Sequence, residues 1–435
     1  MSRFLFAVFP VTGHVNPGLP IARELVERGH DVRWYSTRRF QRAIESIGAR
    51  WVPFRHAMQF DEEGMEGMFP DRPKGGIPQI RYDIEKVFVN ILPGALFDLE
   101  EELAKEPADA IVGDNAFGVC ALIKERHAIP WAAYGITPLA IPSRDTAPFG
   151  LALMPSSTPL GRLRNRALYW FVDHVIFRRA NARYREIRDA LGMPRVERSI
   201  FDTPRRSDLY LQSSVPSFEY PRTDMPPQLR FIGASIPQPP VNWTPPTWWS
   251  ELDRRRRVVL VTQGTINNDY DQLVRPAIRA LANEDVFVVV TTGSREAEAV
   301  GIDPLPPNVR VERFIPYAQL MPKVDLLLTN GGYGSIQIAL AHGVPVIAIG
   351  KTEEKPEIAN RINWSGVGIG LKVLIPSAEQ IRGAVQRVLN DVTYRARANA
   401  LRYEMSGLDA ATTGADLLEE LAGEPMSRRA CACCA

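Results

Sequence analysis

A histidine follows the first apolar run of the chain, in the segment Gly13-His14-Val15-Asn16-Pro17. Imidazole is the side chain best suited to accepting a proton near neutral pH. The loop after a buried strand is also where open α/β sheets bind their ligands. We therefore interpret His14 as a candidate general base in a loop at the end of the first strand. A histidine that only packs against this loop is the alternative.

A glycine-rich turn is the second candidate for chemistry. Asn330-Gly331-Gly332-Tyr333-Gly334-Ser335 follows an apolar run that ends at Thr329, and it opens a helical pattern. Free backbone N–H groups and the helix dipole form an anion site there, and the missing side chains let a phosphate approach. The spacing matches neither G-x-x-x-x-G-K-[ST] nor G-x-G-x-x-G. We expect a β-branched residue at Gly332 to fill the phosphate site and to strain the turn.

Other chemistries find little support in the residue types. The motifs H-E-x-x-H, paired C-x-x-C and G-x-S-x-G are absent, and the six histidines show no metal-ligand spacing. The sequence therefore predicts no metal site. Asp269-Tyr270-Asp271 has the form of a D-x-D metal motif, but a cap at the start of a helix is a more ordinary role for it.

Strand-like and helical runs alternate along the chain, and they predict the sheets that must position these residues. The first amphipathic helix is expected at residues 18–30, after the His14 loop. Repeated strand–helix–strand units of this length form parallel, doubly wound sheets with right-handed crossovers. The predicted fold class is α/β, with two Rossmann-like domains whose parallel sheets face each other across a cleft. The expected strands lie at residues 4–10, 31–37, 50–54, 109–114, 131–136, 256–265, 286–293, 309–315, 324–329 and 344–350.

Two stretches fall outside this alternating pattern. Residues 137–200 combine a Pro-, Ser- and Gly-containing loop with an aromatic helical run at 167–177. Such a stripe belongs to a core more often than to a binding surface, but a long loop beside it can line an apolar pocket. Residues 57–69 have a similar mixed character, and we interpret them as a candidate flap.

Composition excludes several classes of partner. The 435-residue chain has a net charge of +2, which gives no reason to expect nucleic-acid binding. No apolar run approaches the roughly 20 residues of a membrane span, and the first apolar stretch lacks a signal-peptide cleavage site. Three of the four cysteines lie within the last residues, which does not suit a disulfide framework. We expect a cytoplasmic monomer or homodimer without stable membrane insertion.

In its motifs and the order of its elements, the chain resembles the family-1 glycosyltransferases with the GT-B fold. That family includes bacterial macrolide and antibiotic glycosyltransferases and the UDP-glycosyltransferases of plants and fungi, and the resemblance spans nearly the whole chain. In it, the histidine of G-H-x-N-P deprotonates the acceptor hydroxyl, and a carboxylate after a later strand orients the histidine. The resemblance implies these catalytic roles for His14 and for Asp114, which ends the run at residues 109–114.

The family's donor motifs W-x-P-Q, H-x-G-x-[NG]-S-x-x-E and D-Q match this chain with substitutions. Asn330 replaces the histidine that binds phosphate. Ile338 replaces the glutamate that holds the ribose hydroxyls, which favours a deoxyribose nucleotide such as dTDP. Phe314 can still stack on a pyrimidine. The implied donor-binding residues are Thr262, Gly264, Thr265, Phe314, Ile315, Asn330, Gly331, Gly332, Gly334, Ser335, Glu354 and Lys355.

The resemblance also implies how the domains divide the substrates. The expected acceptor-binding residues are Gly13, Phe60, Met154 and Trp170. A stretch rich in Pro and Trp between the two halves cannot hold regular structure and predicts a linker. We expect an acceptor-binding domain at 1–232, the linker at 233–247, a nucleotide-sugar donor domain at 248–405, a helix at 406–425 that packs back on the first domain, and a disordered tail at 426–435.

The predicted function is the inverting, metal-independent transfer of a hexose from a UDP- or dTDP-hexose to a hydroxyl of an apolar small molecule, such as a polyketide, macrolide or phenol. The nucleotide sugar is a co-substrate, and no cofactor is expected. Because the donor motif departs from the family at Asn330 and Ile338, a catalytically silent nucleotide-sugar-binding auxiliary protein is one alternative. A sugar-nucleotide epimerase of the same fold is the other.

Overall fold

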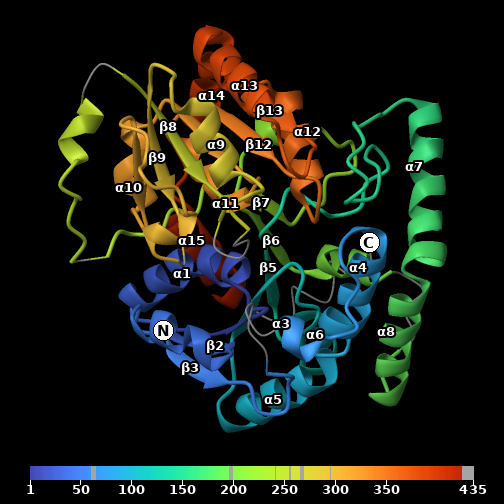
Figure 1. The fold of residues 1–435 in the computed structure, drawn as a ribbon. Coiled ribbons are helices and arrows are strands. Elements are labelled where there is room, and N and C mark those ends of the chain that lie inside the picture. Colours follow the sequence, from blue (N-terminus) through green and yellow to red (C-terminus); the bar gives the residue numbers. More distant parts are fainter. Residues whose placement is uncertain are drawn as a thin grey trace.

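Two α/β domains make up the molecule (Figure 1), which is described here from a computed structural model. The structure describes residues 1–59, 65–194, 199–240, 242–253, 256–264, 269–293 and 295–423. All ten expected strands are present, and β6, β7 and β13 are additional ones. The predicted fold class, with two parallel sheets covered by helices, is confirmed.

The first domain is built on a seven-stranded sheet in the order β3-β2-β1-β4-β5-β6-β7, and every neighbouring pair is parallel. Its strands are β1 (Arg3–Ala7), β2 (Asp31–Ser36), β3 (Arg50–Pro53), β4 (Ala110–Asp114), β5 (Trp131–Gly135), β6 (Leu209–Gln212) and β7 (Leu229–Phe231). Its helices are α1 (Thr12–Glu27), α2 (Gln41–Glu45), α3 (Met65–Met68), α4 (Gly76–Tyr82), α5 (Leu92–Lys105), α6 (Val119–His127), α7 (Pro159–Phe171) and α8 (Arg178–Ala190).

The second domain has a six-stranded parallel sheet in the order β10-β9-β8-β11-β12-β13. Its strands are β8 (Arg257–Thr262), β9 (Val286–Thr291), β10 (Val309–Glu312), β11 (Leu326–Thr329), β12 (Val346–Ile349) and β13 (Gly368–Leu371). The remaining helices are α9 (Val274–Leu281), α10 (Tyr317–Leu320), α11 (Tyr333–Ala341), α12 (Lys355–Ser365), α13 (Ala378–Asn390), α14 (Val392–Met405) and α15 (Ala410–Gly423).

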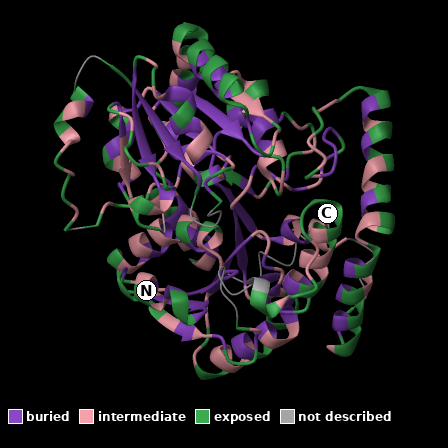
Figure 2. Cartoon of the chain, viewed as in Figure 1, coloured by how far each residue is buried: buried purple, intermediate pink, exposed green. Residues whose placement is uncertain are grey.

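Both faces of each sheet are buried, as expected of parallel sheets covered by helices. Along β1, Leu5 and Ala7 pack into one apolar cluster, whereas Phe4 and Phe6 pack into another on the opposite face. This alternation explains why the strands are almost continuously apolar in sequence. Figure 2 shows the buried strands at the centre of each domain, with the exposed residues on the outer helices.

Each sheet has a point where the strand order reverses. In the first sheet the reversal lies between the neighbouring strands β1 and β4, and in the second it lies between β8 and β11. Helices leave the two strands on opposite sides at such a point and open a crevice at the carboxyl ends. His14 follows β1 and Asp114 ends β4. Thr262 ends β8 and Asn330 follows β11. The predicted catalytic and phosphate-binding residues therefore lie at the two reversal points.

Helix α1 begins earlier than the sequence predicts. His14 lies in its first turn and not in a loop, and both Pro17 and Pro20 lie inside the helix. The sequence placed Pro17 in the loop before the helix, whereas Pro20 already lay inside the helix expected at residues 18–30. The helix continues because its buried face, including Val15, Ile21 and Leu25, packs against the sheet.

The last helix returns to the first domain. Helix α15 packs along α1 (Figure 1), and Arg28 beyond the end of α1 pairs with Asp416 at 2.6 Å and with Glu419 at 2.8 Å. A Cβ atom on Gly414 would lie only 3.0 Å from the side chain of Ile21, so the two helices approach closely. Among the described helices, none is both long and apolar enough to cross a membrane.

Candidate active site

The His14 and Asp114 side chains form a hydrogen-bonded pair at the first reversal point. His14 Nδ1 lies 3.0 Å from Asp114 Oδ1, and Asp114 is fully buried. The carboxylate also accepts the backbone N–H groups of Phe9 at 2.7 Å and Ala116 at 2.9 Å. An ionised carboxylate only accepts, so it assigns the imidazole proton to Nδ1 and leaves Nε2 free to take a proton.

Helix α1 is fixed where it carries His14. The Tyr134 hydroxyl, from β5, donates to the His14 carbonyl at 2.7 Å. A Cβ atom on Gly18 would lie 2.9 Å from that hydroxyl, so only glycine permits the contact. Gly13, in the same first turn, has no neighbour within 4 Å of a Cβ position and faces open space.

Two phenylalanines beside His14 were not predicted as site residues. The ring of Phe9 lies 5.5 Å from the imidazole, and Phe88 stacks on Phe9 at 4.3 Å and lies 6.4 Å from His14. Phe9 lies two residues after the end of β1, in the apolar run that leads to His14. Phe88 lies in η2 (Asp83–Val89), far from His14 in sequence, and only the tertiary structure reveals it. Together they give the base an apolar aromatic wall.

The second reversal point joins two of the predicted donor segments. The Asn330 backbone N–H donates to the Thr262 carbonyl at 3.3 Å, and its side-chain amide donates to the Gln263 carbonyl at 2.5 Å. Gly264, with a φ of +78°, lies against the Asn330 side chain. Asn330 therefore links the two loops, a role that the sequence did not suggest.

The glycine-rich turn leads directly into α11, as expected, but its strain lies at a different glycine. Gly331 has a φ of +95°, and a Cβ atom there would contact the Lys355 side chain at 3.4 Å. Gly332 caps α11 with a φ of −63°, which any residue can adopt, and its nearest neighbour would be the Ser335 hydroxyl at 3.5 Å. The expectation that a side chain at Gly332 strains the turn is wrong, because its backbone is not left-handed.

Glu354 and Lys355 lie at the start of α12, beside the glycine turn. Burial, with the charge of Glu353 nearby, raises the pKa of the Glu354 carboxyl, while the charge of His14 acts in the opposite direction. The carboxyl ends of the two sheets meet beside this turn, where Gln212 at the end of β6 donates to the Tyr333 hydroxyl at 2.8 Å. Lys355 Nζ pairs with Glu353 at 2.8 Å, and Glu353 itself is left-handed with a φ of +57°.

The other predicted donor residues divide into exposed and buried ones. Phe314 is 55% exposed after β10, so its ring is free to stack on a planar base. The side chains of Ile315 and Ile338 are buried in the apolar cluster of the second domain, which leaves them packing roles. Gly334 is exposed in the first turn of α11, where Ser335 donates to the Gly332 carbonyl.

Of the predicted acceptor residues, Gly13 adjoins His14, whereas Met154 and Trp170 are not gathered there. Trp170 lies on the outer helix α7 at the edge of the molecule (Figure 1), 60% exposed and stacked on His174. Met154 lies in the loop before α7, and its sulfur accepts a hydrogen bond from Tyr220. Among described residues no contact joins either one to His14. Phe60 and Thr265 lie outside the described residues.

The D-x-D segment makes local contacts. Asp269 accepts from the Asp271 backbone N–H at 3.2 Å and from the Gln272 amide at 3.1 Å, whereas Asp271 pairs with Arg275 at 2.7 Å. These contacts close a turn ahead of α9, which begins only at Val274, so Asp269 is not the cap of that helix. Within the described part of the chain, no three His, Cys, Asp or Glu side chains lie close enough to share a metal ion.

Comparison with known proteins places this geometry in a family. Residues 275–421 match the model of the "Erythromycin biosynthesis protein CIII-like, C-terminal domain". The chain is 45% identical to 4'-demethylrebeccamycin synthase of Lentzea aerocolonigenes, over 97% of this chain and 99% of that protein. It belongs to the family-1 glycosyltransferases. The chain is thus an enzyme, a glycosyltransferase of the natural-product type.

Two further comparisons bear on the nucleotide. UDP-glycosyltransferase 2 of Phaeomoniella chlamydospora is 34% identical, over 96% of this chain and 95% of that protein. The solved structure of the spinosyn rhamnosyltransferase SpnG, complexed with thymidine diphosphate, superposes with a TM-score of 0.68 at 16% identity and covers 96% of this chain and 100% of that one. The structural likeness confirms the GT-B fold.

Proposed function

We propose that this glycosyltransferase transfers a hexose, with inversion and without a metal ion, from a dTDP- or UDP-hexose to a hydroxyl of an apolar natural product. One observation carries the proposal: the His14–Asp114 pair and the start of α11 occupy the two reversal points, and Gln212 at the end of β6 donates to the Tyr333 hydroxyl at the start of α11 at 2.8 Å. A base for the acceptor and an anion site for the donor diphosphate therefore face one another.

The proposed reaction follows from these positions. His14 Nε2 takes the proton as the acceptor oxygen attacks the anomeric carbon, and the new carbon–oxygen bond forms on the face opposite the phosphate. The bond between that carbon and the phosphate oxygen breaks, and the diphosphate leaves with its electron pair. Asp114 stabilises the imidazolium that forms, and the N–H groups at the start of α11 stabilise the growing charge on the diphosphate.

The substrate classes are proposed from the site and the relatives. Open space at Gly13 and the Phe9–Phe88 wall suit an apolar acceptor. The name of the relative from Lentzea supports a natural-product acceptor. SpnG with thymidine diphosphate supports a dTDP-sugar. The buried Ile338 also supports a dTDP-sugar, because it replaces the ribose-binding glutamate that the family resemblance implies at this position. The name of the relative from Phaeomoniella supports a UDP-sugar. We also propose a cytoplasmic location and a monomer or homodimer.

Product analysis tests this proposal. The protein, treated with a chelator, is supplied with dTDP-glucose or UDP-glucose and with an alcohol, a phenol or an indole as acceptor. We expect transfer to a hydroxyl from one of the donors, and NMR of the product should show the anomeric configuration opposite to that of the donor. Retained configuration, loss of activity with the chelator, or transfer only to the indole nitrogen would each contradict the corresponding part of the proposal.

A further inference from the structure

The seam between the two domains contains a buried carboxylate that the reaction above does not use. Glu219 follows η5 (Pro216–Phe218) of the first domain, and only 1% of it is exposed. Its Oε1 accepts the Leu139 backbone N–H at 3.0 Å and the Tyr333 hydroxyl at 3.2 Å, and its Oε2 accepts Arg361 Nε at 2.8 Å. One side chain thus joins a segment of the first domain to helices α11 and α12 of the second.

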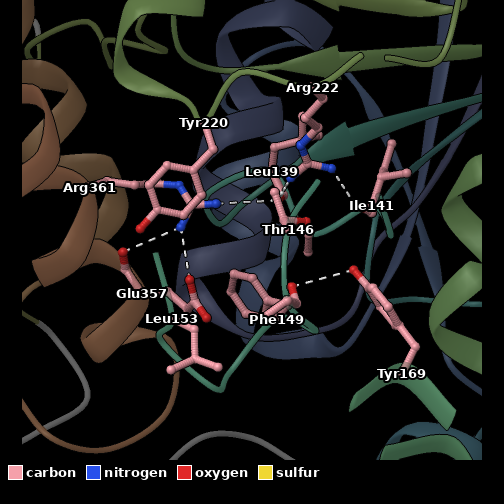
Figure 3. A pocket seen from close by; sticks show the side chains of 12 residues that line it. Leu139, Ile141, Thr146, Phe149, Leu153, Tyr169, Tyr220, Arg222, Glu357 and Arg361 are labelled. Carbon is pink, nitrogen blue, oxygen red and sulfur yellow. Dashed lines mark hydrogen bonds and ion pairs between the residues drawn. The ribbon is translucent and has the colours of Figure 1, made fainter. Parts of the chain in front are cut away.

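Arg361, in α12 of the second domain, contacts residues of both domains. It also pairs with Glu357, one helical turn earlier in α12, at 3.0 Å, and its guanidinium lies over the Tyr220 ring at 4.3 Å (Figure 3). Glu357 accepts the backbone N–H groups of Gly150 at 3.0 Å and Ala152 at 2.7 Å, both in the first domain. Glu219 of the first domain and Glu357 of the second both bind Arg361, and both also accept backbone N–H groups of the first domain. The two carboxylates therefore connect the domains.

Water is nearly excluded from this seam. The charged residues that form it, Glu219, Glu357 and Arg361, are 1%, 4% and 2% exposed. Burial raises the pKa of the Tyr220 phenol to about 12 and raises the pKa of the Tyr333 phenol well above its usual value. Charges in such surroundings are little screened, so an unpaired one is strongly disfavoured.

The anchor points of the seam lie next to the donor residues. Tyr333 is the first residue of α11, directly after the glycine turn, and its hydroxyl also accepts the Gln212 amide at 2.8 Å. Arg361 lies in α12, the helix that begins after Glu354. A shift of either anchor would move the diphosphate site or the sugar site relative to His14.

We propose that Glu219 is a positioning residue that holds α11 and α12 in one orientation against the acceptor side of the first domain. A buried ion pair adds little net stability compared with an apolar contact, but it disfavours every arrangement that leaves one of its charges alone. The seam therefore selects one relative position of the two substrates. The inference rests on the proposed donor site at α11.

Two substitutions break one arm of this connection each. Tyr333→Phe removes the hydroxyl between Glu219 and α11 and keeps the ring. Glu219→Gln keeps an oxygen for Leu139 but removes the charge that faces Arg361. Tyr35→Phe is the matched control, because the Tyr35 hydroxyl is equally buried and donates to a carboxylate, Asp98, at 2.7 Å within the first domain alone.

A comparison of kcat with nucleotide affinity distinguishes a positioning role from a role in nucleotide binding. We expect Tyr333→Phe to lower kcat for transfer about 10- to 100-fold, as misplacement by a fraction of an ångström to an ångström does. The Kd of dTDP or UDP should stay within about threefold, and Tyr35→Phe should keep kcat within about twofold of wild type. A nucleotide affinity that falls in step with kcat, or an equal loss in the control, would overturn the positioning role.

Small-angle X-ray scattering tests the same connection without turnover. We expect Glu219→Gln to increase the radius of gyration, while the Tyr35→Phe control matches wild type. An unchanged radius in Glu219→Gln would overturn the inference. If the radius increases but the wild-type protein transfers no sugar, the positioning role is supported and the proposed function is contradicted, so the two failures are distinguishable.

Discussion

At the scale of single residues, the catalytic pair depends on neighbours that fix each of its atoms. Asp114 uses both oxygens, one for the Phe9 N–H and one shared by His14 and Ala116. A carboxylate held in this way cannot turn away from the imidazole. His14 is thus supplied with a fixed tautomer and a fixed direction before any substrate binds.

The first prediction concerns this pair. His14→Ala should lower transfer to an aliphatic alcohol by roughly 10²–10⁴, the usual contribution of a positioned base, and should leave donor affinity near wild type. Asp114→Asn should lower it less, because an amide still orients the ring but does not stabilise its charge. Initial rates of the wild type and of both variants with one alcohol provide the measurement.

A surface histidine serves as the control for that experiment. His127 lies in α6 and pairs with Glu100 at 2.8 Å on the exterior, so His127→Ala should leave transfer unchanged. A phenol, which is more acidic than an alcohol, should depend on His14 less strongly. Full activity of His14→Ala on the alcohol would show that the histidine only packs.

The second prediction concerns Glu354, whose carboxyl pKa is raised by burial and by Glu353. A carboxylate accepts a sugar hydroxyl more strongly than a carboxylic acid does, by roughly tenfold in affinity. Because the pKa is raised, this gain should be complete only at a higher pH than for an ordinary glutamate and should be lost as the pH falls. The measurement is the Kd of a nucleotide sugar relative to that of its nucleoside diphosphate across acidic and neutral pH.

Glu354→Gln is the reference for this titration. The terminal phosphate of the diphosphate also titrates, but it does so equally for both proteins, so the difference between wild type and variant isolates the carboxyl. The variant should show no pH-dependent gain from the sugar. An identical pH dependence in both proteins would mean that Glu354 does not contact the sugar.

At the scale of elements, the sequence identified most helices and strands but misplaced the start of α1. Nearly continuous apolar runs that alternate with helical patterns predicted ten strands, because strands buried on both faces are apolar almost throughout. The segment from Gly13 to Pro17 suggested a loop around His14, yet packing of Val15 and Ile21 maintains the helix. Local propensity cannot reveal this, since the stabilising contacts come from other elements.

The candidate site shows the same limit. Motifs identified His14, Asp114 and the glycine turn, because their spacing along the chain is itself the signal. The motifs did not predict Phe88 and Glu219, because each acts through contacts with residues distant in sequence. Trp170 was predicted from its place in an aromatic helical run beside a long loop, and the structure places it on an outer helix.

The third prediction distinguishes the two neighbouring glycines before α11. Gly332→Val should fold normally, because its φ of −63° suits any residue, but its side chain should occupy the space where a phosphate would bind. Gly331→Val should lower the unfolding temperature as well, since its φ of +95° is strained for valine and its Cβ would press on Lys355. Calorimetric nucleotide binding and thermal unfolding of both variants provide the test. Nucleotide affinity unchanged in Gly332→Val would exclude the helix start as the diphosphate site.

At the scale of the whole molecule, the domains are joined three times by separate means. The segment at residues 233–240 runs between the sheets, with the Ser235 hydroxyl bound to the Pro17 carbonyl at 2.8 Å. The Glu219–Arg361 seam connects them beside the substrate sites. Helix α15 crosses from the second domain to α1. Two of these connections, the first and the last, end on the helix that carries His14, so the position of the base depends on both domains.

The last prediction tests the crossing of α15. Gly414→Val should push α15 away from α1, because even a Cβ atom there would lie 3.0 Å from Ile21, and overpacking of this kind costs about 1–3 kcal/mol. Gly383→Val is the matched control: it introduces the same residue into helix α13, where a Cβ atom meets nothing within 4 Å and valine has the higher helix propensity. We expect Gly414→Val to lower both the unfolding temperature and kcat, since Ile21 lies two turns beyond His14 on the same helix. The control should lower neither. If Gly414→Val loses stability but keeps its full kcat, α15 stabilises the fold without setting the position of the base.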